Sequence, residues 1–230
     1  MRKIIVGAFV SLDGVMQAPG GPQEDPTGGF GLGGWIAPLF DAECGTAIGG
    51  LLDGEYDLLL GRRTYDIFAA HWPHVSKDPK AKNYDPHAAT IGEQFDRVTK
   101  YVATHRPESL AWKNSKALGT DVVGALRALK KEDGPDLVTQ GSTELLHQLF
   151  AHDLVDVLQV LTFPIVLGRG KRLFDPTSAP AGLRLEKAVT STNGAIIARY
   201  VRAGSVKTGS FALEEPTPEE IERRKNLSRT

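Results

Sequence analysis

Residues Leu58–Tyr65, with the sequence LLLGRRTY, pass from an apolar strand to a helix through a single glycine. The leucines before Gly61 predict a strand, and the basic and hydroxyl residues after it predict the first turn of a helix. Residues Leu137–Glu144, LVTQGSTE, repeat this arrangement around Gly141. Both stretches are typical of strand-to-helix junctions in an α/β protein.

The rest of the chain continues this alternation. Residues Lys3–Val10 form a nearly continuous apolar run, which predicts a buried central strand. Further predicted strands are Tyr56–Leu60, Val98–Thr104, Leu137–Gln140 and Val155–Phe163, and the predicted helices are Asp41–Leu52, Arg62–Ala70, Val122–Lys131 and Thr143–His152. Asp41 is a candidate N-cap of its helix, and Thr120 is the predicted start of the helix over 122–131. Such alternation favours a mostly parallel sheet with helices on both faces.

The C-terminal part of the chain has a different pattern. Two predicted strands, Leu183–Thr190 and Ala195–Val201, are joined by a turn that contains Asn193-Gly194, a strong hairpin signal. We therefore expect an antiparallel hairpin to close the sheet and one domain to span residues 1–203. Residues 204–230 are predicted to be a charged tail that is either flexible or a short helix.

Residues 17–34 break all periodicity, because they contain seven glycines and three prolines in 18 residues. Loops of this length are usually functional or disordered. Two interpretations stay open at this point. The segment is either a lid over a site next to the first strand or a disordered surface excursion.

The two glycine junctions are also candidate anion sites. Free N–H groups at a helix N-terminus attract anions, and glycine allows a ligand to approach the backbone closely. Arg62 and Arg63 oppose the helix dipole, which costs free energy unless an anion lies there. Thr104-His105-Arg106, at another strand end, has the groups to hold a ribose 2′-phosphate. The alternatives are ordinary tight turns for the junctions and a solvated loop for residues 104–106.

Composition and charge exclude several classes of protein. The 27 Lys and Arg residues nearly balance the 28 Asp and Glu residues, which argues against general binding to nucleic acid or to anionic membranes. No apolar run approaches the ~20 residues that cross a bilayer. Cys44 is the single cysteine, so no intramolecular disulfide forms, and the six histidines do not cluster as metal ligands. We expect a cytoplasmic protein without a metal.

The familiar nucleotide-binding motifs are absent from the sequence. Neither the Rossmann G-x-G-x-x-G after a first strand nor the P-loop G-x-x-x-x-G-K-[ST] occurs, and Gly168-Arg169-Gly170 has only the first half of the former. A nucleotide would have to be held by another architecture.

Several segments, taken in order, resemble a known family. They are Ser11-Leu12-Asp13-Gly14, Leu60–Tyr65 with Trp72 beyond it, and Leu154-Val155-Asp156 leading through Pro164 to Gly168-Arg169-Gly170 and Leu173-Phe174. Over residues 1–203 the chain is similar to the C-terminal domain family of the bacterial riboflavin-biosynthesis reductase RibD. That family belongs to the dihydrofolate reductase-like superfamily.

The resemblance implies a three-layer α/β/α fold, NADPH as cofactor, an oxidoreductase activity and a homodimer. It matches Gly61, Arg62, Arg63 and Thr64 to a cofactor-phosphate turn, Gly141, Ser142 and Thr143 to a second one, and Thr104, His105 and Arg106 to the 2′-phosphate and ribose region. It also places Asp13 and Gly14 beside the nicotinamide. As proton donors we consider Asp13 and Asp41, each also explained as a turn former or an N-cap, or water.

The substrate side of the resemblance is weaker. The chain has no zinc-deaminase signature, and it has Asp156-Val157 where the family usually has Asp-Glu. The segment around residues 17–41 is more similar to stand-alone members of the family. The expected function is the NADPH-dependent reduction of a small heterocyclic or ribityl-type molecule, resembling 5-amino-6-(5-phosphoribosylamino)uracil reductase of riboflavin biosynthesis. A dihydrofolate-type pterin reductase and a non-catalytic nucleotide-binding module are the alternatives.

Overall fold

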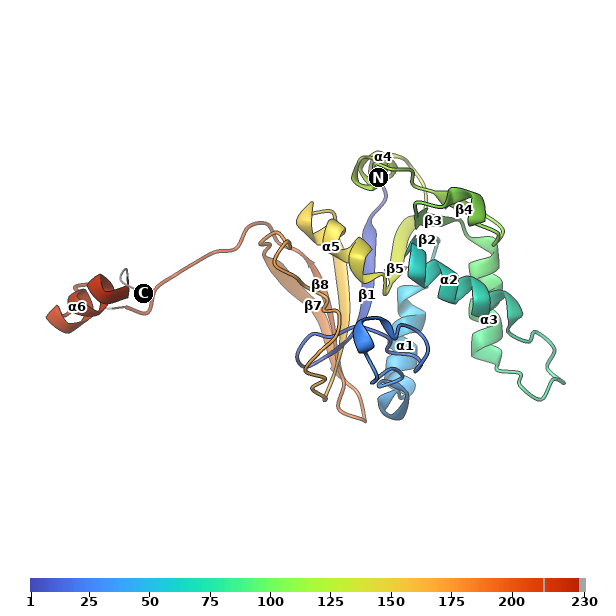
Figure 1. Cartoon of the computed structure of the whole chain (residues 1–230), viewed down its shortest axis with the longest axis horizontal. Coiled ribbons are helices and arrows are strands. Elements are labelled where there is room, and N and C mark those ends of the chain that lie inside the picture. The colour runs from blue at the N-terminus through green and yellow to red at the C-terminus, as the bar shows by residue number, and fades with distance from the viewer. Residues whose placement is uncertain (213, 228–230) are drawn as a thin grey trace.

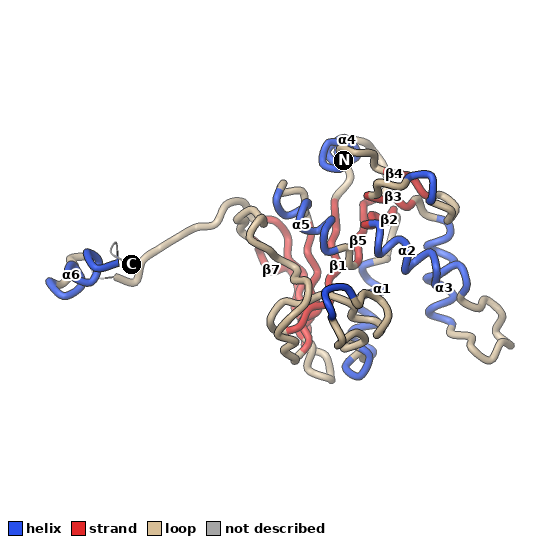
Figure 2. The backbone as a smooth tube through the Cα atoms, viewed as in Figure 1, coloured by secondary structure: helices blue, strands red, loops and turns tan. Residues whose placement is uncertain are grey.

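The computed structural model describes residues 1–212 and 214–227. Its strands are β1 Ile4–Ser11, β2 Tyr56–Gly61, β3 Lys100–Ala103, β4 Ser115–Ala117, β5 Asp136–Gln140, β6 Val157–Phe163, β7 Leu183–Thr190 and β8 Ile196–Arg202. Its α-helices are α1 Ala42–Leu51, α2 Arg62–His71, α3 Pro86–Arg97, α4 Val122–Lys131, α5 Thr143–Ala151 and α6 Pro218–Leu227. Figures 1 and 2 show how the helices surround the strands.

The strands form one eight-stranded sheet in the order β4-β3-β2-β5-β1-β6-β8-β7. The first six strands in this order are parallel, β8 is antiparallel to β6, and β7 is antiparallel to β8. The mostly parallel sheet closed by a C-terminal hairpin is confirmed. Parallel strands share a carboxyl edge, so the loops that follow β1, β2, β3 and β5 come together there.

The central strand β1 is covered on both faces, which explains its continuous apolar run. Ile4 and Val6 pack in one cluster with residues of α4 and α5, such as Leu126 and Leu146. Ile5, which points to the opposite face, packs in a second cluster that holds side chains of α1 and α3. A third cluster buries Cys44 with Phe163 and Trp35. The three-layer α/β/α arrangement is therefore confirmed.

Several predicted boundaries differ from the structure by one or two residues. Helix α4 begins after Asp121, whose carboxylate accepts from the Gly124 amide, so the expectation that Thr120 starts it was wrong. Two elements had no prediction, α3 and β4. Helix α3 has a sequence signal, since Asp85 caps it and Pro86 is its first residue. Strand β4 has only three residues and no such signal.

The C-terminal tail contains α6, which lies away from the sheet in Figure 1. Glu219 and Glu220 are in its first turn and Arg224 and Lys225 in its last, an arrangement that the helix dipole favours. Among residues 1–212 and 214–227, none of the helices has the length and hydropathy that a membrane span requires.

Candidate active site

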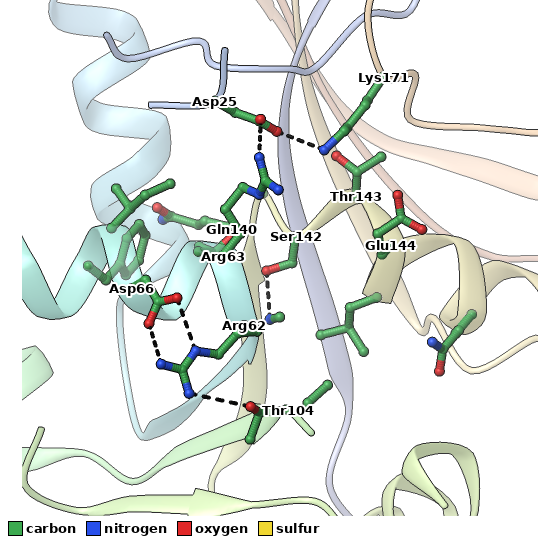
Figure 3. Close-up of a pocket in the computed structure, with 18 of the residues that line it drawn as sticks. Asp25, Arg62, Arg63, Asp66, Thr104, Gln140, Ser142, Thr143, Glu144 and Lys171 are labelled. Carbon is green, nitrogen blue, oxygen red and sulfur yellow. Dashed lines mark hydrogen bonds and ion pairs between the residues drawn. The ribbon is translucent and has the colours of Figure 1, made fainter. Parts of the chain in front are cut away.

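A pocket of about 1030 Å³ opens at the carboxyl edge of the parallel strands. It is lined from the β2–α2 junction, from the end of β3, from the β5–α5 junction and from residues 16–25 (Figure 3). Ten predicted cofactor residues line it: Gly61, Arg62, Arg63, Thr64, Thr104, His105, Arg106, Gly141, Ser142 and Thr143. The fold thus brings together three segments that the sequence separates by about forty residues each.

Helices α2, α4 and α5 begin at the pocket, and two of them, α2 and α5, lack side-chain caps. Helices α1, α3 and α4 each begin with an aspartate whose carboxylate accepts from a first-turn amide. By contrast, α2 begins at Gly61 and α5 at Ser142, and neither residue makes a side-chain cap bond. The first-turn N–H groups of α2 and α5 are therefore left for an external acceptor, and both helix dipoles favour an anion.

Ser142 joins the two junctions. Its hydroxyl oxygen accepts from the Gly61 amide at 2.8 Å, so its hydroxyl hydrogen stays available to a ligand. A Cβ on Gly61 would lie 3.2 Å from the Ser142 Cβ, which is closer than most Cβ atoms approach a neighbouring side chain. Gly141 has a φ of +72°, a conformation that favours glycine. The two glycines therefore allow the junctions to approach each other and leave the backbone open to the pocket.

Arg62 is tied to the strand end that follows β3. Its Nη1 donates to the Ser109 hydroxyl at 2.6 Å and to the Arg106 carbonyl at 3.2 Å. Thr104 accepts a third, longer bond at 3.4 Å, and its hydroxyl also accepts from the Arg106 amide. The predicted 2′-phosphate residues therefore form one cluster at one end of the pocket.

Residues 17–34 form the opposite wall. The Gln17 side-chain amide donates to the carbonyls of Asp25 and Thr27, both at 2.9 Å, and the Trp35 indole donates to the Gln17 carbonyl. Phe30 and Trp35 are buried in the core. The segment is thus packed and held by hydrogen bonds, and the interpretation as a disordered excursion was wrong.

Asp25 connects this wall to the rest of the site. Its carboxylate is buried and makes ion pairs with Arg63 of α2 and, at 2.8 Å, with Lys171 (Figure 3). Burial raises the pKa of Asp25, but hydrogen bonds from Lys171 and Thr27 outweigh burial and lower the pKa overall. Sequence reasoning missed Asp25, because no local pattern indicates that a loop aspartate meets two distant cations.

Glu24, the neighbour of Asp25, also lines the pocket. Its Oε2 accepts from the amides of Gly20 at 2.7 Å and Gly21 at 3.2 Å. Partial burial is the largest influence on this carboxyl group and raises its pKa above the ordinary value. Glu24 is therefore the pocket acid best suited to hold a proton, and its place in a glycine-rich loop hid it from the sequence analysis.

Gln140 is a third pocket residue that the sequence did not indicate. Its Nε2 is buried and has no hydrogen-bond partner within the part of the chain that the structure describes. An unpaired buried amide costs free energy, so it marks a place where a bound molecule would supply an acceptor.

The structure places Asp13, Gly14 and Asp41 outside the pocket lining. Asp13 accepts from the Ser11 hydroxyl at 2.6 Å and from the amides of Leu167 and Gly168, and these bonds lower its pKa to about 2. Asp41 caps α1. The hydrogen bond from the Asn193 amide, together with that from the Cys44 amide, holds the pKa of Asp41 well below its ordinary value. The structure therefore does not bring these two acids into the lining of this pocket, and their role as proton donors stays a prediction. Both carboxylates stabilise loops and stay ionised, which does not suit a proton donor.

The family model of the RibD C-terminal domain matches residues 2–197 of this chain. The chain belongs to the RibD C-terminal domain family. Two proteins of Bacillus subtilis strain 168, the uncharacterized YyaP and YwjB, are similar to this family member. YyaP is 24% identical over 85% of this chain and 92% of its own length, and YwjB is 25% identical over 88% and 99%.

Solved structures share the fold of this RibD C-terminal domain. A protein assigned to riboflavin biosynthesis in Shewanella sp. PV-4 has a TM-score of 0.58 and 18% identity, covering 87% of this chain and 99% of its own. A pyrimidine reductase-like protein of Corynebacterium diphtheriae has a TM-score of 0.54 and 14% identity, with 88% and 92% covered. The Thermotoga maritima diaminohydroxyphosphoribosylaminopyrimidine deaminase/5-amino-6-(5-phosphoribosylamino)uracil reductase also has a TM-score of 0.54, with 13% identity, and this chain spans 57% of it.

Proposed function

We propose that this protein is an NADPH-dependent reductase of a small heterocyclic, pyrimidine-type molecule. The observation that carries the proposal is the pair of uncapped helix N-termini, at Gly61 and Ser142, that open into one pocket beside Arg62 and Arg106. A dinucleotide with three phosphates needs several anion sites in a row, and this arrangement supplies them. Membership of the RibD C-terminal domain family supports the same activity.

The residues present fit NADPH. The turns 61–64 and 141–143 would hold the diphosphate through backbone amides and hydroxyls, and Arg62, Thr104, His105 and Arg106 would hold the 2′-phosphate. When bound, the cofactor supplies a hydride to an electrophilic carbon of the substrate. We also propose a cytoplasmic location, since the single cysteine, Cys44, is free and fits a reducing compartment.

The other end of the pocket suits a flat polar ring. Phe9, Met16 and Pro19 contribute apolar surface to the pocket lining, and the buried Gln140 amide beside them would have to turn toward a ring carbonyl or nitrogen to donate to it. Asp25 stays ionised and orients Arg63 and Lys171, so the wall is rigid and charged. These residues would position the ring.

Glu24 is the proposed source of the proton that completes the reduction. It lines the pocket, and two backbone amides fix its carboxyl group. A raised pKa favours the protonated form that a general acid needs. Glu24 replaces Asp13 and Asp41 in this role.

The cofactor assignment is tested by binding of NADPH and NADH to the wild type and to Arg106→Ala. We expect NADPH to bind more tightly than NADH, because Arg106 contributes charge at the 2′-phosphate end, and we expect the variant to lose roughly tenfold in NADPH affinity with little change for NADH. Arg62→Ala should have a larger effect, since it also releases the loop 104–109. NADPH affinity that is unchanged in both variants would overturn the assignment.

The substrate class is tested by the loss of reduced nicotinamide with pyrimidines, including 5-amino-6-(5-phosphoribosylamino)uracil, and with pterins. Turnover of an aminopyrimidine supports the proposal, whereas turnover of pterins alone indicates a dihydrofolate-type reductase. NADPH binding with no turnover of either group would indicate a non-catalytic module on the same fold.

A further inference from the structure

Asp66 lies one helical turn after Arg62, inside the cluster assigned to the 2′-phosphate. Its carboxylate accepts from Arg62 Nε at 3.0 Å and pairs with Arg62 Nη2 at 2.8 Å (Figure 3). Arg106 Nη2 lies 3.9 Å from the same carboxylate. Asp66 lines the pocket and is nearly half exposed, so a ligand can reach it.

The carboxylate occupies the edge of Arg62 that an anion would otherwise use. A guanidinium binds phosphate best through two parallel N–H groups, and here Nε and Nη2 already face Asp66. The remaining nitrogen, Nη1, donates to Ser109, Arg106 and Thr104. A 2′-phosphate bound to these arginines would therefore lie next to a negative charge that repels it.

The same carboxylate suits a ribose without the 2′-phosphate. An ionised Asp is an acceptor only, and a free 2′-hydroxyl is a donor, so the two groups form a charge-assisted hydrogen bond. The two arginines favour the phosphorylated ribose, and Asp66 favours the unphosphorylated one.

We propose that Asp66 sets the cofactor selectivity of this protein by competing with the 2′-phosphate for Arg62 and Arg106. The inference rests on the proposed function, since it assumes that a nicotinamide cofactor binds here. It implies that the wild type accepts both NADPH and NADH, with a preference for NADPH that is smaller than two unopposed arginines would produce.

If Asp66 only positions Arg62, removal of its carboxylate should change the affinity for the 2′-phosphate in the opposite direction. An Arg–Asp pair four residues apart also stabilises a helix and holds the arginine in place. If that were its only role, removal of the carboxylate would weaken binding of the 2′-phosphate, because Arg62 would lose its support.

The test is calorimetric binding of 2′,5′-ADP and 5′-AMP, which differ only in the 2′-phosphate, to wild type and Asp66→Asn. We expect the ratio of their affinities to shift toward 2′,5′-ADP by roughly tenfold in the variant, the size of one charge a few ångströms from a phosphate. Asp66→Glu keeps the charge and should keep the wild-type ratio. Glu108→Gln, an exposed charge change in the neighbouring turn 107–109, is the matched control and should also keep it.

The outcomes distinguish a failure of the competing role of Asp66 from a failure of the proposed function. If the wild type binds either nucleotide but Asp66→Asn leaves the ratio unchanged or shifts it toward 5′-AMP, the competing role of Asp66 is overturned and the proposed function stands. If the wild type binds neither nucleotide, the proposed function itself is overturned, and the inference with it. A thermal melt of each variant shows whether it is folded under the conditions of the titration.

Discussion

Glu24 is the residue on which the proposed chemistry depends most. Its carboxyl group lines the pocket and is held by the amides of Gly20 and Gly21, while Asp25 beside it is committed to two cations. Adjacent carboxyl groups with opposite pKa shifts suit different roles, one as an acid and one as a fixed charge.

We expect Glu24→Gln to lower kcat by roughly a hundredfold on the pyrimidine turned over best, with NADPH affinity unchanged, because the variant keeps the shape but cannot release a proton. Steady-state rates and cofactor titrations measure the two effects.

Asp13→Asn and Asp41→Asn are the comparison variants. They should lower the melting temperature and leave kcat within about threefold, since their carboxylates hold loops outside the pocket. A kcat loss confined to those two variants would contradict the assignment.

Lys100 on β3 is a fully buried lysine whose Nζ donates to the Val98 carbonyl and lies 4.4 Å from the centre of the Trp112 ring. Burial lowers its pKa from 10.5 to about 8. Between these values the unfolded chain binds more protons than the folded protein, so the lysine destabilises most below about pH 8 and its penalty disappears as the pH rises toward 10.5.

The measurable consequence is a pH dependence of the difference between wild type and Lys100→Met. From about pH 7.5 to about pH 9.5 the wild type should gain about 2 kcal/mol of unfolding free energy relative to the variant. Urea titrations at both pH values measure this difference. Lys131→Met, which removes an exposed lysine, should show almost no such gain, and an equal gain in both variants would contradict the argument.

At the scale of elements, the hairpin β7–β8 is the least covered part of the sheet. Strand β7 is exposed along its whole length and forms the sheet edge. Leu185 lies opposite Tyr200, and Leu183 and Ile196 share that face by the two-residue period of the strands. Leu183, Leu185 and Ile196 are each about half exposed. An exposed edge strand with an apolar face is a site of association.

We propose that a second copy of the chain covers this face, and we expect a dimer in sedimentation equilibrium at micromolar concentration. Leu185→Lys should shift the mass toward one chain, because a charge would have to be buried in the contact. Arg184→Lys, a neighbouring change without a change of charge, should leave the dimer intact. A mass of one chain for the wild type at these concentrations would exclude this association.

At the scale of the whole molecule, the topology gives the pocket two different ends. Parallel strands β2, β3 and β5 bring their following turns to one edge, where uncapped helices and arginines gather. The chain between β1 and α1 covers the other end and is held there by Asp25. One side of the pocket is thus built from the turns that follow the parallel strands, and another from the loop between β1 and α1.

Sequence patterns predicted the alternation of strands and helices, the closing hairpin and ten residues that line the pocket. These features depend on local rules, such as apolar period, glycine at a strand end and turn chemistry, that act within a few residues. The covered central strand is one example, because a continuous apolar run from Ile4 to Val10 can be buried only between two layers.

Only the tertiary structure decided the partners of the charged side chains. Asp25 meets Arg63 from 38 residues away and Lys171 from 146 residues away. Asp13 and Asp41, the acids that the sequence favoured, accept from amides 155 and 152 residues away and lie outside the pocket lining. A carboxylate's role follows from its burial and its partners, and both are set by contacts between distant segments. Local pattern therefore predicted which strand-to-helix turns line the pocket, and the packing of the loop 17–34 decided that Glu24 and Asp25 line it as well.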